Sequence, residues 1–195
     1  MKKRKPIIAF DVDGTLSQLY EYGLSIMDPP RKMEEIKKHT DFTKMFPDRE
    51  QWRTWMREND VRRNASPYPI MLGTWKLFYD DPDFECIIIT STSYLPDQKA
   101  MLDWMTAHLD ERMDIHFTNN KTDVLFDVII EDRVSNVLGA VKRGRLGFVV
   151  ERPWNRAEAE GQVGRPGFFL VKDSEVYNSV LEALWWRDHF PRQRP

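Results

Sequence analysis

Two carboxylates at positions i and i+2, Asp11 and Asp13, are the side chains whose types and spacing best fit chemistry. They end the apolar run 7–10, which predicts a buried parallel strand, and Gly14 and Thr15 follow them. Two such acids point to opposite faces of a continuing strand, so they can serve one site only where the strand ends. Gly14 permits that ending. Ligands bind beyond the carboxyl ends of strands in open α/β sheets, so we expect a site here. A plain Asp-Gly turn is the alternative.

Three further groups suit a phosphoryl ligand, which needs a hydroxyl or amide donor, a fixed cation and a carboxylate for a metal. Thr90 and Ser91 end a second apolar run, Lys121 precedes a later one, and Glu131-Asp132 closes that run. Each group also has an ordinary interpretation: a polar loop, a solvated lysine, and acids favoured by the dipole of the next helix. Together they favour a site, because each lies at a strand end or in the loop before a strand.

The rest of the sequence predicts the elements that position these groups. Apolar runs predict strands over 7–10, 84–90, 114–117, 128–130, 147–151 and 168–171, and helical periodicity is found over 70–79, 96–109, 133–143 and 174–186. The stretch 158–167 is expected to be an exposed loop. Strands that alternate with helices imply right-handed crossovers and a parallel sheet. We therefore expect an α/β fold, a three-layer Rossmann-like sheet.

The segment 17–66 departs from this alternation, because it is charged and helix-like and is bounded by prolines. We expect a helical cap there, with a core formed by 1–16 and 67–195. Helices are predicted over 31–39 and 49–59, the second capped by Asp48. Trp52, Trp55 and Met56 form a stripe on it, which either packs the cap or stacks on a planar ring of a substrate.

Composition limits the class of protein. The 195 residues, 41% hydrophobic and 31% charged, are typical of a globular protein, and the net charge of −2 argues against a strongly basic nucleic-acid binder. The single cysteine, Cys86, lies in an apolar run and is expected to be a core thiol in a reducing, cytoplasmic setting. The basic residues 1–5 resemble a solvated arm rather than a signal peptide, and no run is long enough to span a membrane.

In order, these motifs resemble those of the haloacid dehalogenase-like phosphohydrolases. The run Asp11-Val12-Asp13-Gly14-Thr15 is similar to the first motif, Thr90 to the second, Lys121 to the third and Glu131-Asp132 to the fourth. The later part, from Thr118 to Arg133, is similar in type and spacing to the 5'(3')-deoxyribonucleotidases. Glu131 stands where that group more often has an aspartate, and the insert does not match by residue.

The resemblance implies a mechanism that these residue types can perform. Asp11 would attack phosphorus, and Asp13 would act as the general acid and then the general base. Mg²⁺ would be held by the Asp11 carboxylate, the Asp13 main-chain carbonyl and Asp132, and Glu131 would either contact it or orient a water on it. Dehalogenases of the superfamily lack the second acid, so Asp13 favours phosphate esters.

The substrate groups follow from the same comparison. Lys121 and Thr90 would hold phosphate oxygens, Thr15 and Ser91 are further candidates, and Trp52 and Trp55 are candidates for holding a base. The expected function is a Mg²⁺-dependent phosphatase for nucleoside 5'-monophosphates, with deoxyribonucleotides favoured. A polynucleotide 3'-phosphatase, a small-ester phosphatase and a silent nucleotide-sensing module are the alternatives.

Several other features leave two interpretations open. Residues 153–156 either form a surface turn, which we favour, or close over the phosphate side. Arg133 and Asn136 are candidates for bracing the site. Trp185 and Trp186 either cover the sheet or contact a second copy of the chain in a homodimer. The expected partner is a small phosphorylated substrate, a nucleic-acid end is less favoured, and no membrane is expected.

Overall fold

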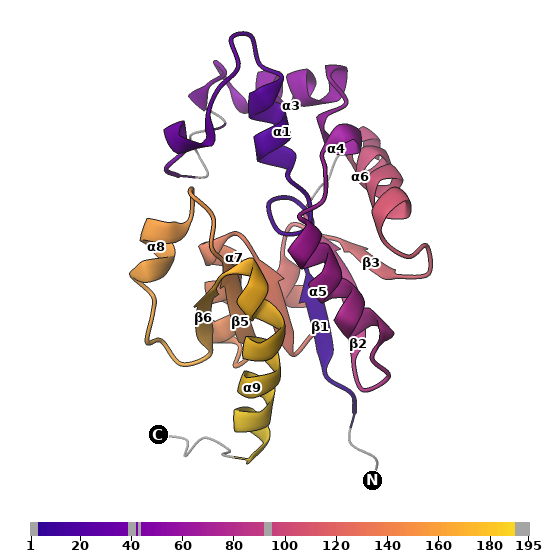
Figure 1. Ribbon diagram of the computed structural model, residues 1–195, viewed down its shortest axis with the longest axis vertical. Helices are drawn as coiled ribbons and strands as arrows, with labels where there is room; N and C mark the ends of the chain where they lie inside the picture. Colours follow the sequence, from indigo (N-terminus) through magenta and orange to yellow (C-terminus); the bar gives the residue numbers. More distant parts are fainter. Residues whose placement is uncertain (1–3, 39–41, 43, 92–94, 190–195) are drawn as a thin grey trace.

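A six-stranded, all-parallel sheet forms the lower body of the molecule in the computed structural model, which describes residues 4–38, 42, 44–91 and 95–189 (Figure 1). The strand order is β3-β2-β1-β4-β5-β6. The strands are β1 (Ile7–Phe10), β2 (Glu85–Thr90), β3 (Asp114–Phe117), β4 (Val128–Glu131), β5 (Leu146–Val150) and β6 (Phe168–Val171). The predicted α/β class with a parallel sheet is therefore confirmed.

The helices lie on both faces of the sheet and beyond its upper edge (Figure 1). Those of the core are α5 (Pro69–Asp80), α6 (Leu95–His108), α7 (Val134–Lys142), α8 (Arg156–Glu160) and α9 (Val176–His189), and those of the insert are α1 (Leu19–Ser25), α3 (Arg49–Glu58) and α4 (Val61–Asn64). Short 3-10 turns are η1 (Met33–Glu35), η2 (Lys121–Asp123) and η3 (Asp173–Glu175).

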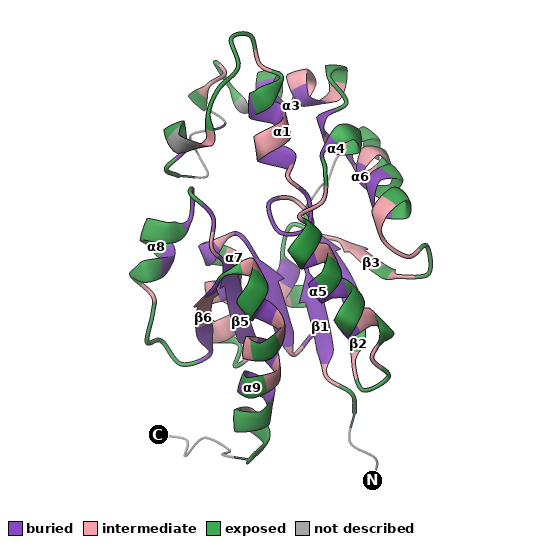
Figure 2. Cartoon of the chain, in the orientation of Figure 1, coloured by how far each residue is buried: buried purple, intermediate pink, exposed green. Residues whose placement is uncertain are grey.

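The central strand β1 explains the three layers. Its residues alternate between two hydrophobic clusters, Ile8 and Phe10 on one face and Ile7 and Ala9 on the other. The first cluster includes side chains of α5, α6 and α9, and the second is covered mainly by α7. Buried positions follow the strands and the inner sides of the helices, whose outer sides are exposed (Figure 2).

The register fixes where β1 ends. Phe10 lies opposite Ile88 of β2 and Ile130 of β4, and the Asp11 amide still donates to the Ile130 carbonyl at 3.0 Å. Since β1 lies between β2 and β4, whatever follows Phe10 lies at the middle of the sheet's C-terminal edge. The polar residues that end β2 and β4 therefore reach the same place as Asp11.

The chain leaves and re-enters the core at adjacent points. Ser17 and Pro67 form an antiparallel bridge, Gln18 donates its amide to the Ser66 carbonyl at 2.8 Å, and Tyr68 donates to Leu16 at 2.8 Å. Between these points, α1, η1, α3 and α4 lie above the C-terminal edge of the sheet, as a small helical cap (Figure 1). The cap has its own hydrophobic cluster, and α4 packs against α6 of the core.

Most differences from the sequence expectation lie in short elements. The helix expected over 31–39 is a single 3-10 turn, η1, and position 39 is outside the described residues, as are the first three residues of the expected basic arm. A segment with only Met33 and Ile36 to anchor it has too little apolar surface to stabilise a helix. Helices α1 and α4 were not predicted individually, and α8 begins two residues before the expected loop and ends within it. No helix among the described residues is both long and apolar enough to cross a membrane.

Candidate active site

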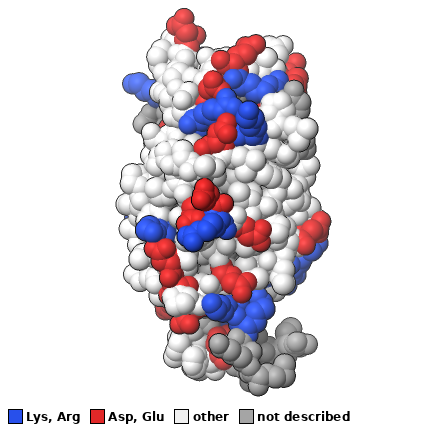
Figure 3. Space-filling model, turned by 90° about the vertical axis from the view of Figure 1, so that its right-hand side faces the viewer, with Lys and Arg blue, Asp and Glu red and all other residues white. Residues whose placement is uncertain are grey.

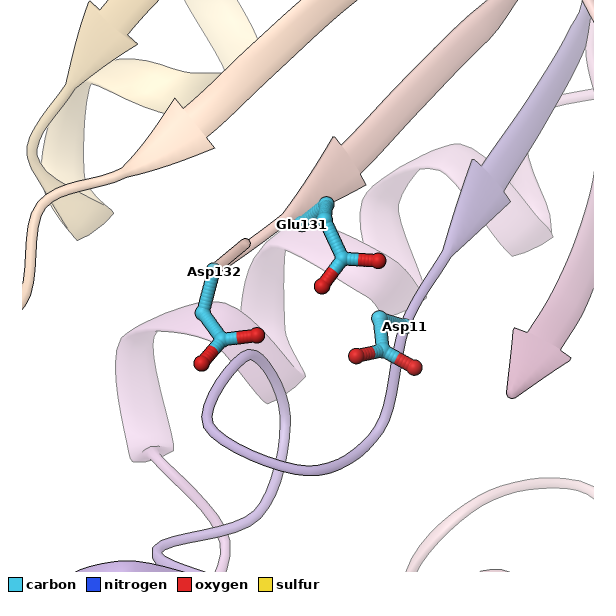
Figure 4. Close-up of side chains that lie close together, drawn as sticks. All are labelled: Asp11, Glu131 and Asp132. Atoms are coloured by element: carbon cyan, nitrogen blue, oxygen red, sulfur yellow. The ribbon is translucent and has the colours of Figure 1, made fainter. Parts of the chain in front are cut away.

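Three carboxylates from two neighbouring strands converge at the C-terminal edge of the sheet. Asp11 follows β1, and Glu131 and Asp132 end and follow β4. One oxygen from each lies within 4.8 Å of the others, and the three side chains point toward a common space (Figure 4). All three residues are buried, with at most 5% of their surface exposed. Asp11 and Glu131 are about 120 positions apart in the sequence, and the pairing of β1 with β4 brings them together.

Lys121 lies against these acids, as its position before β4 led us to expect. Its Nζ is 2.6 Å from Asp11 Oδ1 and 2.5 Å from Glu131 Oε2, and the side chain is 3% exposed. It comes from η2, the turn that connects β3 to the segment leading into β4. A buried ammonium between two carboxylates is not a solvated surface lysine, so the ordinary interpretation of Lys121 is excluded.

Glu131 is held on both of its oxygens. Oε2 accepts from Lys121 and from Asn136 Nδ2 at 2.9 Å, and Oε1 accepts from the Arg133 backbone amide at 3.1 Å. Asn136 therefore braces Glu131 through its side chain, as expected. Arg133 braces it through the backbone amide. With both oxygens occupied, Glu131 orients Lys121 and the start of α7.

The charges in this cluster are not balanced by the groups that touch it. Burial, and then the charge of Glu131, raises the pKa of Asp11 to about 7, although Lys121 acts in the opposite direction. Burial and Glu131 also raise the pKa of Asp132. Burial disfavours the charge on Glu131, but Lys121 and hydrogen bonds from neighbouring side chains together outweigh it and lower that pKa to about 2. Asp11 and Asp132 therefore lack a positive partner sufficient for full ionisation.

The loop after β1 presents Asp13 and lets the chain pass close to Asp132. Gly14 has φ +77°, and a Cβ on it would lie 2.5 Å from Asp132 Oδ2, so a side chain is excluded by conformation and by space. Asp13 Oδ2 accepts from Arg62 Nη1 of α4 at 2.5 Å. A residue of the cap, Arg62, thus contacts the second acid of the motif. The sequence analysis did not predict this contact.

Comparisons with known proteins agree with this geometry. No family model and no curated protein matches the sequence. Solved structures do match: a haloacid dehalogenase-like family hydrolase from Streptococcus pneumoniae has 16% identity and a TM-score of 0.58, covering 90% of this chain and 98% of the other. The chain has the haloacid dehalogenase-like fold.

Two further structures with this fold differ in their described activities. A predicted phosphatase from Clostridium acetobutylicum has 15% identity and a TM-score of 0.57, covering 92% of this chain and 100% of the other. The L-2-haloacid dehalogenase from Xanthobacter autotrophicus has 12% identity and a TM-score of 0.56, covering 92% and 99%. The fold therefore does not choose between the two reactions, and the choice rests on residues of the site.

In this haloacid dehalogenase-like fold, Asp132 is positioned by the segment after β5. Trp154 Nε1 donates to Asp132 Oδ2 at 2.8 Å, and Asn155 Nδ2 donates to the Asp132 carbonyl at 2.6 Å. Both residues are 3% exposed. The expected turn is present and its flanking residues Pro153 and Arg156 are exposed, but its two middle side chains are buried against Asp132, so it is not an ordinary surface turn. The other oxygen, Asp132 Oδ1, is buried with no hydrogen-bond partner among the described residues.

Arg152, at the start of the same segment, holds the β1 loop from the other side. Its Nε donates to the Gly14 carbonyl at 2.8 Å, and its Nη1 pairs with Asp173 at 2.6 Å. The guanidinium also lies over the Tyr68 ring, 3.9 Å from the centroid. The only signal for this support in the sequence was a Pro-Trp-Asn sequence two residues after a buried strand, and it does not identify the residues that Arg152 contacts.

The expected phosphate-binding residues lie at this edge, with different exposures. Thr15 is fully buried, and its Oγ1 has no hydrogen-bond partner among the described residues. Thr90 ends β2 and is 1% exposed, and its carbonyl accepts from the Thr118 amide at 3.0 Å. Ser91 is exposed beyond the strand. Residues 92–94 lie outside the described part of the chain.

Trp52 and Trp55 lie apart from the carboxylates, in the cap. Their rings stack on each other at 5.7 Å, and Trp52 also packs against Phe46 at 5.2 Å. Trp52 is 7% exposed and belongs to the cap's hydrophobic cluster, with Trp55 half-buried beside it. The stripe packs the cap, and a substrate-binding role for either ring stays a prediction.

Proposed function

We propose that this chain is a Mg²⁺-dependent phosphatase acting on nucleoside 5'-monophosphates, with deoxyribonucleotides favoured. The observation that carries the proposal is the meeting of Lys121 and Asp132 with Asp11 at the end of β1. A carboxylate nucleophile, a fixed cation and a second carboxylate are what transfer of a phosphoryl group requires. Asp13, which supplies a proton-transferring acid beside them, favours an ester over an alkyl halide.

The donor set fits a magnesium ion. Asp11 and Asp132 offer hard oxygen atoms in one buried cluster, and Asp132 Oδ1 has no hydrogen-bond partner among the described residues. Burial and the charge of Glu131 raise the pKa of both acids. The Asp11 and Asp132 carboxylates would hold the ion together with the Asp13 main-chain carbonyl. Glu131, whose oxygens already accept from Lys121, Asn136 and Arg133, would contribute by positioning. The bound ion would supply positive charge that neutralises the acids and the phosphate.

The first half of the reaction uses the two acids in sequence. An Asp11 oxygen attacks phosphorus while the bond from phosphorus to the ester oxygen breaks. Asp13 donates its proton to that departing oxygen, which leaves as the alcohol of the nucleoside. Lys121, which already contacts Asp11 Oδ1, orients the nucleophile and offsets charge on the phosphate oxygens.

The second half returns the enzyme to its starting state. Asp13, now ionised, takes a proton from a water whose oxygen attacks phosphorus, and the bond to Asp11 breaks to release phosphate. Thr15 and Thr90, buried hydroxyls at the ends of the loop and of β2, are placed to donate to phosphate oxygens. The unpartnered Thr15 Oγ1 gains an acceptor when phosphate binds.

Phosphate release from a panel of ribo- and deoxyribonucleotides, with Mg²⁺ and with EDTA, tests the proposal. Turnover of 5'-monophosphates that needs Mg²⁺ and is lost in Asp11→Asn is expected, with Asp123→Asn on the surface as the control. Absence of turnover for every mononucleotide would contradict it. Faster release from a 3'-phosphorylated oligonucleotide would instead favour the polynucleotide 3'-phosphatase alternative.

A further inference from the structure

A cavity lies between the cap and the first turns of α6, and Arg62 is among its lining residues. We call it the α4–α6 pocket. It has a volume of about 230 Å³. Its lining comes from α3, α4 and the first turns of α6: Met56, Arg57, Asp60, Arg62, Arg63, Pro96, Asp97, Lys99 and Ala100. All of these residues belong to the described part of the chain.

Arg62 connects this pocket to the candidate active site. It lines the pocket, and its Nη1 lies 2.5 Å from Asp13 Oδ2. In the proposed reaction, Asp13 touches the ester oxygen of the leaving alcohol. The leaving group is then next to Arg62, and the α4–α6 pocket is one arginine side chain further on. Arg62 Nε is buried without a hydrogen-bond partner among the described residues. An acceptor on this side of the site would satisfy it.

Positive residues outnumber negative ones among the charged residues that line the pocket. Four cationic side chains and two carboxylates line it, and no aromatic ring is among its lining residues. On the side of the molecule that carries α4 and α6, Lys and Arg gather in the upper part, between acidic groups (Figure 3). These lining residues therefore offer a nucleobase no ring to stack on.

The cationic side chains of the pocket differ in whether they already form ion pairs with carboxylates. Arg63 pairs with Asp60 at 2.6 Å and with Asp103 at 2.8 Å, and Arg57 contacts Thr54 and Glu50. Lys99 is exposed, and none of its contacts among the described residues is an ion pair. An exposed ammonium and a largely buried guanidinium that line the same pocket form an arrangement that binds an anion.

We propose that the α4–α6 pocket holds a second anionic group carried by the leaving group of the substrate. The preferred ester then has two phosphates, as a nucleoside 3',5'-bisphosphate has, rather than one. A volume of about 230 Å³ is below that of pockets that enclose a whole ligand, which suits one group of a larger molecule. This inference rests on the proposed phosphatase function and names its substrate class more narrowly.

Calorimetric titration of the Asp11→Asn variant with Mg²⁺ present, where the nucleophile is missing, tests the inference by binding alone. Deoxyadenosine 3',5'-bisphosphate is expected to bind about tenfold or more tightly than deoxyadenosine 5'-monophosphate. Adding Lys99→Gln is expected to bring the ratio of the two affinities close to one. Adding Lys142→Gln instead, on the exposed last turn of α7, is expected to keep the ratio.

Two results would overturn the inference: equal binding of both nucleotides, or a ratio that Lys99→Gln leaves intact. A 5'-phosphorylated dinucleotide, which carries its second charge as a phosphodiester, forms a third titration. Binding tighter than that of the bisphosphate identifies an oligonucleotide end as the source of the second charge, and weaker binding identifies a free nucleotide. Failure of the proposed function is seen separately, as absent turnover by the wild-type chain with Mg²⁺.

Discussion

Lys121 is a buried charged residue in a position where an apolar residue would be easier to stabilise. Its ammonium contacts Asp11 and Glu131 with 3% of its side chain exposed, so three charged groups are held out of water. Burial disfavours the charge on Lys121, but Asp11 and then Glu131 outweigh it, and the pKa of Lys121 is raised. A core of apolar residues would be simpler to stabilise. Binding of a ligand, as proposed above, would explain why the acids and the lysine are buried together.

Replacing Lys121 by Met should therefore lower stability strongly. The variant leaves two buried carboxylates without their cation, and the expected loss in the free energy of unfolding is about 3–5 kcal/mol, measured by urea denaturation without Mg²⁺. Lys142→Met, on the exposed end of α7, is the matched control and should change stability by less than about 0.5 kcal/mol. A loss below about 1 kcal/mol for Lys121→Met would show that the ammonium is not the main partner of these acids.

Cys86 gives a second prediction at this scale. Burial, with a smaller effect of Asp81, raises the pKa of the thiol to about 12. Only the thiolate reacts with disulfide reagents, so labelling by 5,5'-dithiobis(2-nitrobenzoate) should be slow near neutral pH in the folded chain and fast in urea. The rate for the folded chain should rise about tenfold for each pH unit through pH 9, because the thiolate fraction grows in that proportion below the pKa. A plateau below pH 9 would contradict the raised pKa.

At the scale of secondary-structure elements, the site could be predicted because the ends of buried strands can be recognised in the sequence. The apolar runs before Asp11, Thr90 and Glu131 have lengths and compositions that only buried strands explain, and the order of a parallel sheet brings their ends together. Lys121 could be placed for the same reason, since its distance along the chain from β4 is short. Local patterns were enough for these residues because each touches the sheet.

The supporting residues could not be predicted, because their contacts depend on how distant elements pack. Arg62 reaches Asp13 from a four-residue helix whose preceding residue, Asp60, has a φ of 47°. Arg152 and Trp154 reach the β1 loop and Asp132 from a segment with no periodicity. The tryptophan stripe of α3 was recognised, but periodicity alone does not tell whether such a stripe faces a substrate or the cap's own core.

The segment after β5 can be tested through its effect on metal affinity. Trp154→Phe keeps a ring against Tyr20 and Phe42, which lie 5.0 and 5.8 Å away, but removes the N–H that donates to Asp132. Loss of such a supporting hydrogen bond is expected to weaken Mg²⁺ binding about 10- to 100-fold, measured by the Mg²⁺ dependence of the unfolding temperature. Trp185→Phe, on the exposed side of α9, should leave that dependence unchanged. An unaltered dependence for Trp154→Phe would mean that Asp132 needs no such support.

At the scale of the whole molecule, two bodies meet at the charged site. The core supplies the sheet edge with Asp11, Lys121 and Asp132, and the cap is joined to it where residues 17–18 and 66–67 pair. The ion pair between Arg62 and Asp13 links the bodies directly at the reaction centre. Arg62 also lines the α4–α6 pocket, so one side chain of the cap contacts both Asp13 and that pocket.

The proposed Mg²⁺ site predicts that the stability of the whole chain depends on Mg²⁺. An ion that binds the folded chain and not the unfolded one adds about 2.7 kcal/mol at a hundred times its dissociation constant. For a chain of this length that corresponds to a rise of about 5–10 °C in the unfolding temperature, observable by calorimetry. Asp132→Asn removes a charged oxygen donor and should abolish most of the rise, whereas Asp123→Asn, on the exposed η2 turn beside Lys121, should retain it. Equal unfolding temperatures for the wild-type chain in Mg²⁺ and in EDTA would contradict the proposal that the three converging carboxylates bind Mg²⁺.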